Sequence, residues 1–225
     1  SITIAAGKTS GSVTIAAPSD DVYRDADLLT VKMTDAQGGN FEQLNVSKIP
    51  VTTIVVDTIN TTVLSLSASN TVSEGGQITY TATLTNPTDT AMTVKLSNGA
   101  VINIAAGKAS GSVNFAAPAD TPYLDGGKVA AIIVDHSGGN FENVAVNYTP
   151  AVTTVTDTTD TTGLSLSATP SVAEGGTIVY TATLTHAAGS AMTVTLSNNA
   201  VIHIAKGALT GSVNYAAPSD DVYKD

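Results

Sequence analysis

The chain has 225 residues, of which 42% are hydrophobic and only 12% are charged, and its net charge is −10. It contains no cysteine, which excludes disulfides, thiolate catalysis and zinc sites built on cysteine. Nine lysines and arginines are too few for the basic clusters that bind phosphate backbones, so we expect no nucleic-acid partner. No apolar run reaches the length of a membrane span, so we also expect no direct membrane insertion.

A repeat with a period of 100 residues organises the sequence. Residues 2–8 return at 102–108 and in part at 202–207, and the polar segment 57–62 returns at 157–162, with no insertion or deletion between copies. The period is longer than that of ankyrin, tetratricopeptide or leucine-rich repeats and is typical of a chain of sandwich domains. Segments 57–62 and 157–162 carry acids and hydroxyls without apolar periodicity, so we interpret each as the joint between two copies.

The first strands of one copy are predicted by alternating polarity. Residues 64–69 form the first strand, and residues 78–85 alternate strictly, with threonines on one face. Residues 92–96 alternate next, and Asn98-Gly99 then predicts a hairpin turn, because both residue types tolerate positive φ. The apolar face of 78–85 comprises Ile78, Tyr80, Ala82 and Leu84.

The later strands follow at short spacing. Apolar positions at 102–104 and 113–115 predict two of them, and the nearly continuous apolar run 129–134 predicts one strand that is covered on both faces. Residues 143–156 predict a long last strand, in which Pro150 requires an edge or a bulge. No segment has a sustained helical period. The expected fold class is all-β, with tandem Ig-like two-sheet sandwiches of about seven strands each.

The phase of the repeat predicts three segments. We predict a complete repeat at 57–156, the C-terminal part of a preceding repeat at 1–56 and the N-terminal part of a following one at 157–225. The two partial repeats lack strands of their own domain, so we expect them to expose core faces and strand edges. We expect them to be completed by neighbouring chains or by a longer array.

The acidic residues are concentrated in loops and joints. The glutamates occupy Val-x-Glu-Gly-Gly and Gly-Gly-Asn-Phe-Glu, while most aspartates lie in Asp-Asp-x-Tyr-x-Asp motifs or at the joints. Such carboxylates indicate a site for a hard cation such as calcium, which takes oxygen ligands. The alternative is that they are solvated turn residues, since aspartate favours turns in any case. The candidate ligands are Asp20, Asp21, Asp25, Asp57, Glu74, Asp120, Asp125, Asp157, Asp160, Glu174, Asp220, Asp221 and Asp225.

No recurrent catalytic constellation is present, so we do not expect an enzyme. His136, His186 and His203 do not recur at their 100-residue equivalents, and we interpret them as surface or turn residues. No histidine–acid pair accompanies the many serines and threonines at a repeated position, which disfavours a hydrolase triad.

Two sets of tyrosines recur in the repeat. Tyr80 and Tyr180 face the predicted core, so core packing explains them better than stacking on sugars. The second set lies in the acidic loop and is expected to pack beneath it; it comprises Tyr23, Tyr123 and Tyr223.

Four motifs, at residues 72–76, 104–108, 120–126 and 155–157, together resemble the Calx-beta type of sandwich. In that family a glutamate after the first strand, acids of a middle loop and aspartates after the last strand share calcium at one pole. Asn60 in the earlier joint and Thr121 in the middle loop depart from this pattern. The ligands that the resemblance implies here are Glu74, Asp120, Asp125, Asp157 and Asp160.

The whole chain resembles the extender repeats of giant type I-secreted RTX biofilm adhesins, the large adhesion proteins of Gram-negative bacteria. The resemblance lies in the order of Asp-Thr-x-x-Thr-Thr, Ser-Leu-Ser-Ala, Glu-Gly-Gly, Tyr-Thr-Ala, Leu-Ser-Asn, Gly-Ser-Val and Gly-Gly-Asn-Phe-Glu-Asn. It implies an extracellular stalk at the bacterial cell surface, rigidified by calcium (Ca2+) between neighbouring repeats of the same chain, that projects a distal adhesive region. The alternative hypothesis is a carbohydrate- or cell-binding module, which an exposed aromatic platform would favour.

Overall fold

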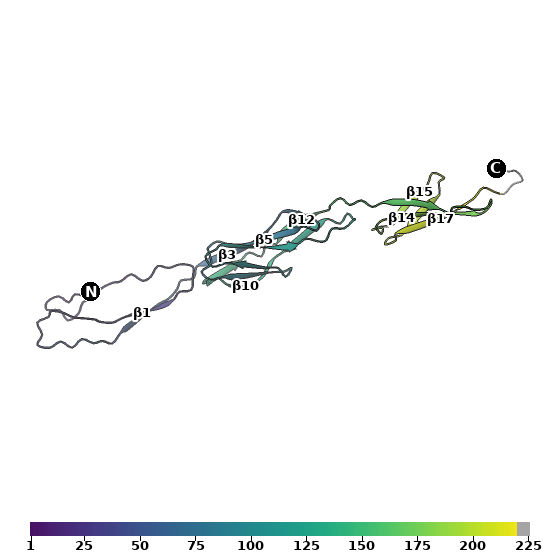
Figure 1. Cartoon of the computed structure of the whole chain (residues 1–225). Helices are drawn as coiled ribbons and strands as arrows, with labels where there is room; N and C mark the ends of the chain where they lie inside the picture. Colours follow the sequence, from purple (N-terminus) through teal and green to yellow (C-terminus); the bar gives the residue numbers. More distant parts are fainter. Residues whose placement is uncertain (220–225) are drawn as a thin grey trace. The chain divides into compact units, whose positions relative to one another are not determined.

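The computed structural model describes residues 1–219, and within them the chain forms strands and turns without any helix. Figure 1 follows the chain by colour from its N-terminal to its C-terminal segment. The all-β fold class predicted from alternating polarity is therefore confirmed. In the same described part, no helix is long and apolar enough to cross a membrane.

The chain divides into two compact units, each assembled from segments that are distant in sequence. Unit 1 comprises Ser1–Ser69, Ile78–Phe115 and Ala130–Val152. Unit 2 comprises Asn70–Gln77, Ala116–Val129 and the chain from Thr153 onward.

Two sheets form the centre of unit 1. One has the order β11-β3-β5-β8, in which β3 and β5 are antiparallel and β11 runs parallel to β3. The other has the order β10-β6-β7. The strands of the first sheet are β3 (Thr61–Ala68), β5 (Gln77–Leu84), β8 (Ser110–Ala116) and β11 (Asn143–Val146). Those of the second are β6 (Met92–Leu96), β7 (Val101–Ile104) and β10 (Ile133–Gly138).

Each of these sheets buries one face, as expected for β-sandwich domains. Along β5 the burial alternates as the sequence pattern predicts, and Tyr80 is fully buried. Burying one large aliphatic side chain contributes about 1.5–3 kcal/mol, so the buried faces of the two sheets contribute strongly to the stability of the unit. Its main members are Leu64, Ile78, Tyr80, Leu84, Met92, Val94, Leu96, Ile102, Ile104 and Ile133.

The N-terminal segment forms a hairpin whose side chains are largely exposed. In it, β1 (Asp27–Val31) pairs antiparallel with β2 (Val51–Val55), and long loops without strands flank β1 (Figure 1, purple). Ile2 is 57% exposed, whereas its equivalent Ile102 is fully buried. The expected exposure of core-type side chains in this segment is therefore confirmed.

Unit 2 contains two further sheets and a strand pair. The first sheet has the order β4-β12-β9, with β12 parallel to β4, and the second has the order β13-β14-β17. Their strands are β4 (Thr71–Ser73), β9 (Gly127–Ala131), β12 (Ala151–Thr156), β13 (Leu164–Ala168), β14 (Thr177–Leu184) and β17 (Thr210–Ala216). The pair comprises β15 (Met192–Thr195) and β16 (Val201–Ile204). A small core of Ala182, Leu184, Ile202 and Ile204 has Tyr180 packed against it.

The prediction of one covered strand at 129–134 is wrong. The chain changes sheets at Ile132, between β9 and β10, so Ala131 and Ile133 are both buried but in different sheets. At the change, the Ile132 N–H donates to Ser97 Oγ at 3.2 Å and the Ser97 N–H donates to the Ile132 carbonyl at 2.9 Å. A continuous apolar run therefore results from two half-covered strands joined end to end.

The prediction of one long strand at 143–156 is also wrong. Pro150 lies between β11 and β12, and each of these strands pairs in parallel with a different partner. Proline has no N–H to continue a ladder, which explains why the strand divides there.

The predicted turn at Asn98-Gly99 forms, but only Gly99 has a positive φ, of 85°. Its N–H donates to the Leu96 carbonyl at 3.0 Å, while the Asn98 side chain accepts from the Ala100 N–H at 3.1 Å. Asn98 thus contributes a side-chain acceptor rather than a left-handed backbone.

Candidate metal centre

Three carboxylates converge at one end of the β4-β12-β9 sheet in unit 2. One oxygen from each of Glu74, Asp125 and Asp157 lies within 4.8 Å of the others. Glu74 is only 6% exposed, Asp157 is half-buried and Asp125 is exposed. The trio therefore has one buried and one solvent-facing member, and it could hold a metal ion.

The parallel pairing of β4 with β12 places Glu74 beside Asp157. Ser73 and Thr156, which end the two strands, are partners in the register. Because parallel strands run in one direction, the residues that follow both ends emerge at the same level. The Glu74 N–H donates to the Thr156 carbonyl at 3.0 Å, which extends the ladder and fixes this position.

The loop before β9 brings Asp125 to the same place. Its backbone N–H donates to Asp157 Oδ1 at 3.2 Å, and its own Oδ1 accepts from the Thr121 hydroxyl at 3.1 Å. Gly126 allows this approach, because a Cβ there would lie 2.8 Å from Asp157 Oδ1. The carboxylates of Asp125 and Asp157 are thus held by backbone and hydroxyl contacts.

Two backbone hydrogen bonds hold the turn after Glu74 against the same loop. The Gly75 N–H donates to the Pro118 carbonyl at 2.7 Å, and the Ala117 N–H donates to the Gly76 carbonyl at 3.0 Å. Gly75 has φ of 68°, a backbone conformation that favours glycine. The Glu-Gly-Gly motif therefore shapes the backbone that presents the buried carboxylate.

The electrostatics of the trio disfavour three negative charges. Burial raises the pKa of Glu74, and the hydrogen-bonding contact and charge of Asp125 and the charge of Asp157 raise it further. A backbone hydrogen bond from Thr121 opposes this shift in the pKa. Like charges at short range favour protonation or a bound cation between them.

One oxygen of the trio has an unmet bonding capacity. Among the described residues, Glu74 Oε2 is buried and makes no hydrogen bond. A buried carboxylate oxygen without a donor is unfavourable, and a cation beside it removes that cost. Because the candidate ligand atoms of the trio are all carboxylate oxygens, they fit hard cations such as calcium better than zinc or copper.

A related acidic cluster lies at the earlier joint, in unit 1. The Asp25 N–H donates to Asp57 Oδ2 at 3.2 Å, which is the contact that Asp125 makes with Asp157. Partial desolvation raises the pKa of Asp25, and its contacts with neighbouring acids raise it further. Those acids are Asp21, Asp57 and Glu142.

Two of the predicted ligands bind the joint segment instead of joining the trio. Asp20 accepts hydrogen bonds from the Thr58 hydroxyl at 2.5 Å and from the Asn60 side-chain amide at 2.7 Å. The hydrogen bond from Thr58 lowers the pKa of Asp20 most, and the one from Asn60 lowers it further. Asp120 likewise accepts from the Thr158 hydroxyl. Both aspartates therefore fasten the start of a joint to the acidic loop.

Three more of the predicted ligands, Asp21, Asp160 and Glu174, are not members of the trio. Asp160 and Glu174 are exposed. Asp21 accepts the Tyr23 N–H at 2.7 Å, so its carboxylate shapes a turn. The last three predicted positions lie outside the described residues; they are Asp220, Asp221 and Asp225.

Sequence reasoning assigned no metal role to Glu142, which the structure places at the earlier joint. Its Oε2 accepts the Asn60 N–H at 2.5 Å, and its charge contributes to raising the pKa of Asp25. The available signal was that Gly-Gly-Asn-Phe-Glu is one of the two motifs that contain the glutamates of this chain.

Tyr23 and Tyr123 do not pack beneath the acidic loop, contrary to the expectation. The Tyr23 and Tyr123 hydroxyls reach the backbone carbonyls of Pro87 and Ala187, respectively. A tyrosine hydroxyl needs a hydrogen-bond partner, and these carbonyls supply one outside the acidic loop. Tyr223 lies outside the described residues.

The sequence matches the family model of the LapA domain three times in succession. The matched segments are residues 1–58, 60–158 and 160–225, so the matches cover nearly the whole chain. Among curated proteins, none matches the chain.

Proposed function

This chain belongs to the LapA domain family of adhesin-type cell-surface proteins, and from this premise we propose that it is an extender segment of a bacterial adhesin. In this proposal, serial β-sandwiches form an extracellular stalk that projects a distal adhesive region in biofilm formation. The protein has a structural and not an enzymatic role. The observation that carries the proposal is the carboxylate trio beside the joint, with its buried and unpartnered Glu74 oxygen.

We assign calcium to this trio. Glu74, Asp125 and Asp157 would hold the ion through carboxylate oxygens, the ligand type that calcium prefers. A bound cation supplies the positive charge that the three carboxylates lack. Calcium sites in extracellular modules typically bind at about 0.1–1 mM, so occupancy would follow the external calcium concentration.

The position of Asp157 links the trio to the joint. Asp157 directly follows β12 and is the first residue of the joint segment 157–162, and Thr158 donates to Asp120 from the same segment. When a cation neutralises the charge of the trio, Asp157 and the residue after it both hold the start of the joint to the acidic loop. Without a cation, repulsion among the carboxylates loosens this attachment, and the joint becomes more flexible.

The experiment is small-angle scattering on the 225-residue chain in millimolar calcium and in chelator, together with calorimetric titration of calcium. We expect saturable calcium binding and a larger, more narrowly distributed maximum dimension with calcium. An Asp157→Asn variant should resemble the chelated wild type even in calcium.

The matched control is Asp135→Asn, which removes one acid that pairs on the surface with Lys95 at 2.9 Å and is not a member of the trio. This control should keep the calcium response of the wild type. If wild-type scattering is the same in calcium and chelator and no calcium binds, the rigidification proposal fails.

A further inference from the structure

One tyrosine contact occurs twice in this chain. Tyr23 Oη donates to the Pro87 carbonyl at 2.7 Å, and Tyr123 Oη donates to the Ala187 carbonyl at 3.0 Å. Each contact lies within one compact unit, spans 64 residues and crosses one of the two predicted joints. Because the long-range contact occurs at equivalent positions of two repeats, it is a feature of the repeat rather than of one joint.

The turn that aims each tyrosine is conserved in geometry although its sequence differs. The Tyr23 N–H donates to Asp21 Oδ1 at 2.7 Å, and the Tyr123 N–H donates to Thr121 Oγ1 at 3.3 Å. Aspartate and threonine both turn the chain by accepting the N–H two residues later. This shared function explains why Thr121 can replace Asp21 in the motif, independently of any metal.

At the first joint, the tyrosine also stacks on an aromatic ring. The rings of Tyr23 and Phe141 have centroids 5.7 Å apart and planes inclined by 26°. Phe141 is 4% exposed, so the ring on which the tyrosine stacks is buried. Offset stacking of this kind contributes beyond the area that it buries.

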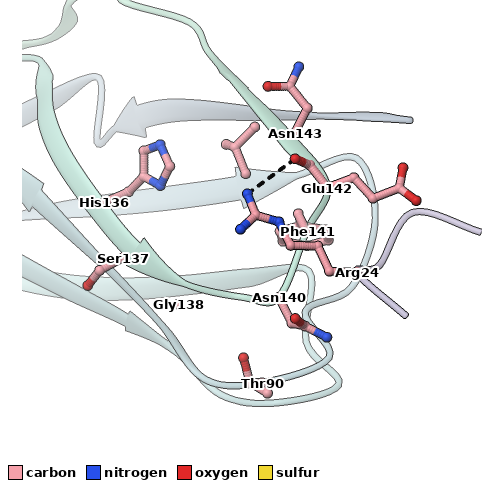
Figure 2. Close-up of a pocket in the computed structure, with 10 residues that line it drawn as sticks. Arg24, Thr90, His136, Ser137, Gly138, Asn140, Phe141, Glu142 and Asn143 are labelled. Carbon is pink, nitrogen blue, oxygen red and sulfur yellow. Dashed lines mark hydrogen bonds between the residues drawn. The ribbon is translucent and has the colours of Figure 1, made fainter. Parts of the chain in front are cut away.

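The backbone on either side of the tyrosine is paired with the same segment. The Arg24 N–H donates to the Asn140 carbonyl at 3.1 Å, and the Glu142 N–H donates to the Val22 carbonyl at 3.1 Å. Figure 2 shows Arg24 reaching over this segment, with its guanidinium on the Glu142 carbonyl at 3.3 Å. The loop and the segment thus form a short antiparallel bridge.

The receiving segment is shaped by its sequence. Gly138, Gly139 and Asn140 have φ values of 84°, 90° and 55°, a run that only glycine and asparagine readily adopt. A Cβ on Gly139 would lie 2.9 Å from the Phe141 ring. The Gly-Gly-Asn-Phe-Glu motif therefore presents its phenylalanine to the preceding loop.

At the second joint, the tyrosine packs on a glycine. A Cβ on Gly189 would lie 2.8 Å from the Tyr123 ring, so the ring rests directly on the backbone there. Tyr123 is 40% exposed, whereas Tyr23, which also contacts Phe141, is half-buried. The carbonyl contact is thus common to both joints, and at the first joint the aromatic contact adds to it.

We propose that this tyrosine is a latch between consecutive repeats, whose partner is the 86–90 or 186–190 loop of the next repeat. The latch uses a phenol, a backbone carbonyl and an aromatic ring, and none of the three carboxylates of the trio. It therefore orients the joint without calcium, and it goes beyond the calcium function proposed above. A chelated array keeps partial order at its joints instead of becoming freely hinged.

The test is a distance measurement across the second joint in chelator. Because the chain has no cysteine, Thr83→Cys and Thr183→Cys, at exposed positions of β5 and β14, allow two spin labels to be placed uniquely. Tyr123→Ala should broaden the distance distribution strongly. Tyr123→Phe keeps the ring but loses one hydrogen bond, and it should raise the undocked population about fivefold.

Gly189→Ala places a methyl group where the Tyr123 ring packs. It should broaden the distance distribution without changing the tyrosine. Tyr148→Phe is the control, because Tyr148 is 65% exposed and belongs to neither joint segment. Equal distributions for wild type, Tyr123→Ala and Gly189→Ala in chelator would overturn the latch. Adding calcium separates the two proposals: narrowing in Tyr123→Ala supports the metal site, and absence of narrowing in every variant counts against the metal site alone.

Discussion

Asp125 donates its backbone N–H to Oδ1 of Asp157 at 3.2 Å, so Asp157 both fastens a loop and contributes a carboxylate to the trio. Asp157→Asn keeps an oxygen acceptor but removes the charge. We expect its calcium affinity to fall about tenfold or more, because affinity follows the number of charged ligands. In chelator the midpoint temperature of its thermal unfolding should be unchanged or slightly higher than that of the wild type, because repulsion within the trio is relieved.

Asp157→Ala removes the acceptor as well as the charge. It should lose calcium affinity to the same degree, and it should also increase amide exchange at Asp125, whose N–H has no second acceptor among the described residues. Calorimetric titration and hydrogen exchange measure the two effects separately. If Asp157→Asn unfolds in chelator as readily as Asp157→Ala, then the charge of Asp157, and not its acceptor, supports the fold.

The pH dependence of stability should reverse when calcium is added. The pKa of Glu74 is raised above its usual value of 4.5 by burial and by Asp125 and Asp157, so the folded state binds this proton more tightly than the unfolded state. In chelator, the contribution of Glu74 to stability is therefore greatest below pH 4.5 and is lost as pH rises through the folded pKa. In calcium the ion requires the deprotonated form, so its stabilisation grows over the same rise in pH.

Glu74→Gln provides the control for this prediction. The amide does not titrate, so in chelator the variant should lack the loss of stability that the wild type shows as pH rises from about 4.5. It should also bind calcium more weakly. Thermal unfolding from pH 4 to 7.5, with and without calcium, tests this, and identical chelator profiles for the two proteins would contradict it.

The sequence pattern identified local elements better than their partners. The alternation at 78–85 predicted β5 and its buried face, because period-two polarity has one structural meaning at that length. The run at 129–134 has two meanings, one doubly covered strand or two strands in different sheets, and composition cannot separate them. Which strands pair was also not visible, since β4 and β12 are about 80 residues apart in the sequence.

The same distinction applies to the candidate site. Glu74 and Asp157 were identifiable because each follows a strand, but only the parallel pairing of β4 with β12 makes them neighbours. Asp20 and Asp120 belong to the same motif as Asp125, yet they accept hydrogen bonds from joint threonines. A residue type at a loop position thus indicates a possible ligand, while its hydroxyl neighbours decide whether the carboxylate is already engaged.

The turn after β6 allows a matched test of backbone conformation. Gly99 has φ of 85°, and Asn199 occupies the equivalent position with φ of 63°. Gly99→Ala should cost about 1–2 kcal/mol, because alanine tolerates this region poorly. Gly99→Asn should cost clearly less, and Asn199→Gly should be neutral or slightly stabilising. Chemical denaturation measures these differences, and equal costs for alanine and asparagine would show that space rather than φ constrains this turn.

The two joints differ at Ile59/Thr159 and at Asn60/Asp160, and exchanging the residue at the second of these positions should exchange their calcium dependence. Asn60 donates its side-chain amide to Asp20 at 2.7 Å and to the Asp21 carbonyl at 2.9 Å, whereas the equivalent Asp160 has no N–H to donate from its side chain. In chelator, Asn60→Asp should therefore loosen the first joint, because it replaces a donor by a charge that repels Asp20.

Loss of the Asn60 donor should also raise the pKa of Asp20, since that bond and the one from Thr58 lower it. The stability that Asp20 contributes is present above its usual pKa of 3.8 and is lost as pH falls through the lowered value, so this acid-sensitive component should shrink in Asn60→Asp. The reciprocal variant Asp160→Asn introduces at the second joint the type of side-chain donor that Asn60 supplies at the first, and it should tighten the second joint in chelator. Amide exchange of Thr58 and Thr158 with and without calcium measures both joints in one chain. We expect faster amide exchange at Thr58 in Asn60→Asp, reversed by calcium, and slower amide exchange at Thr158 in Asp160→Asn. Unchanged rates at both threonines would mean that position 60 does not control the joint.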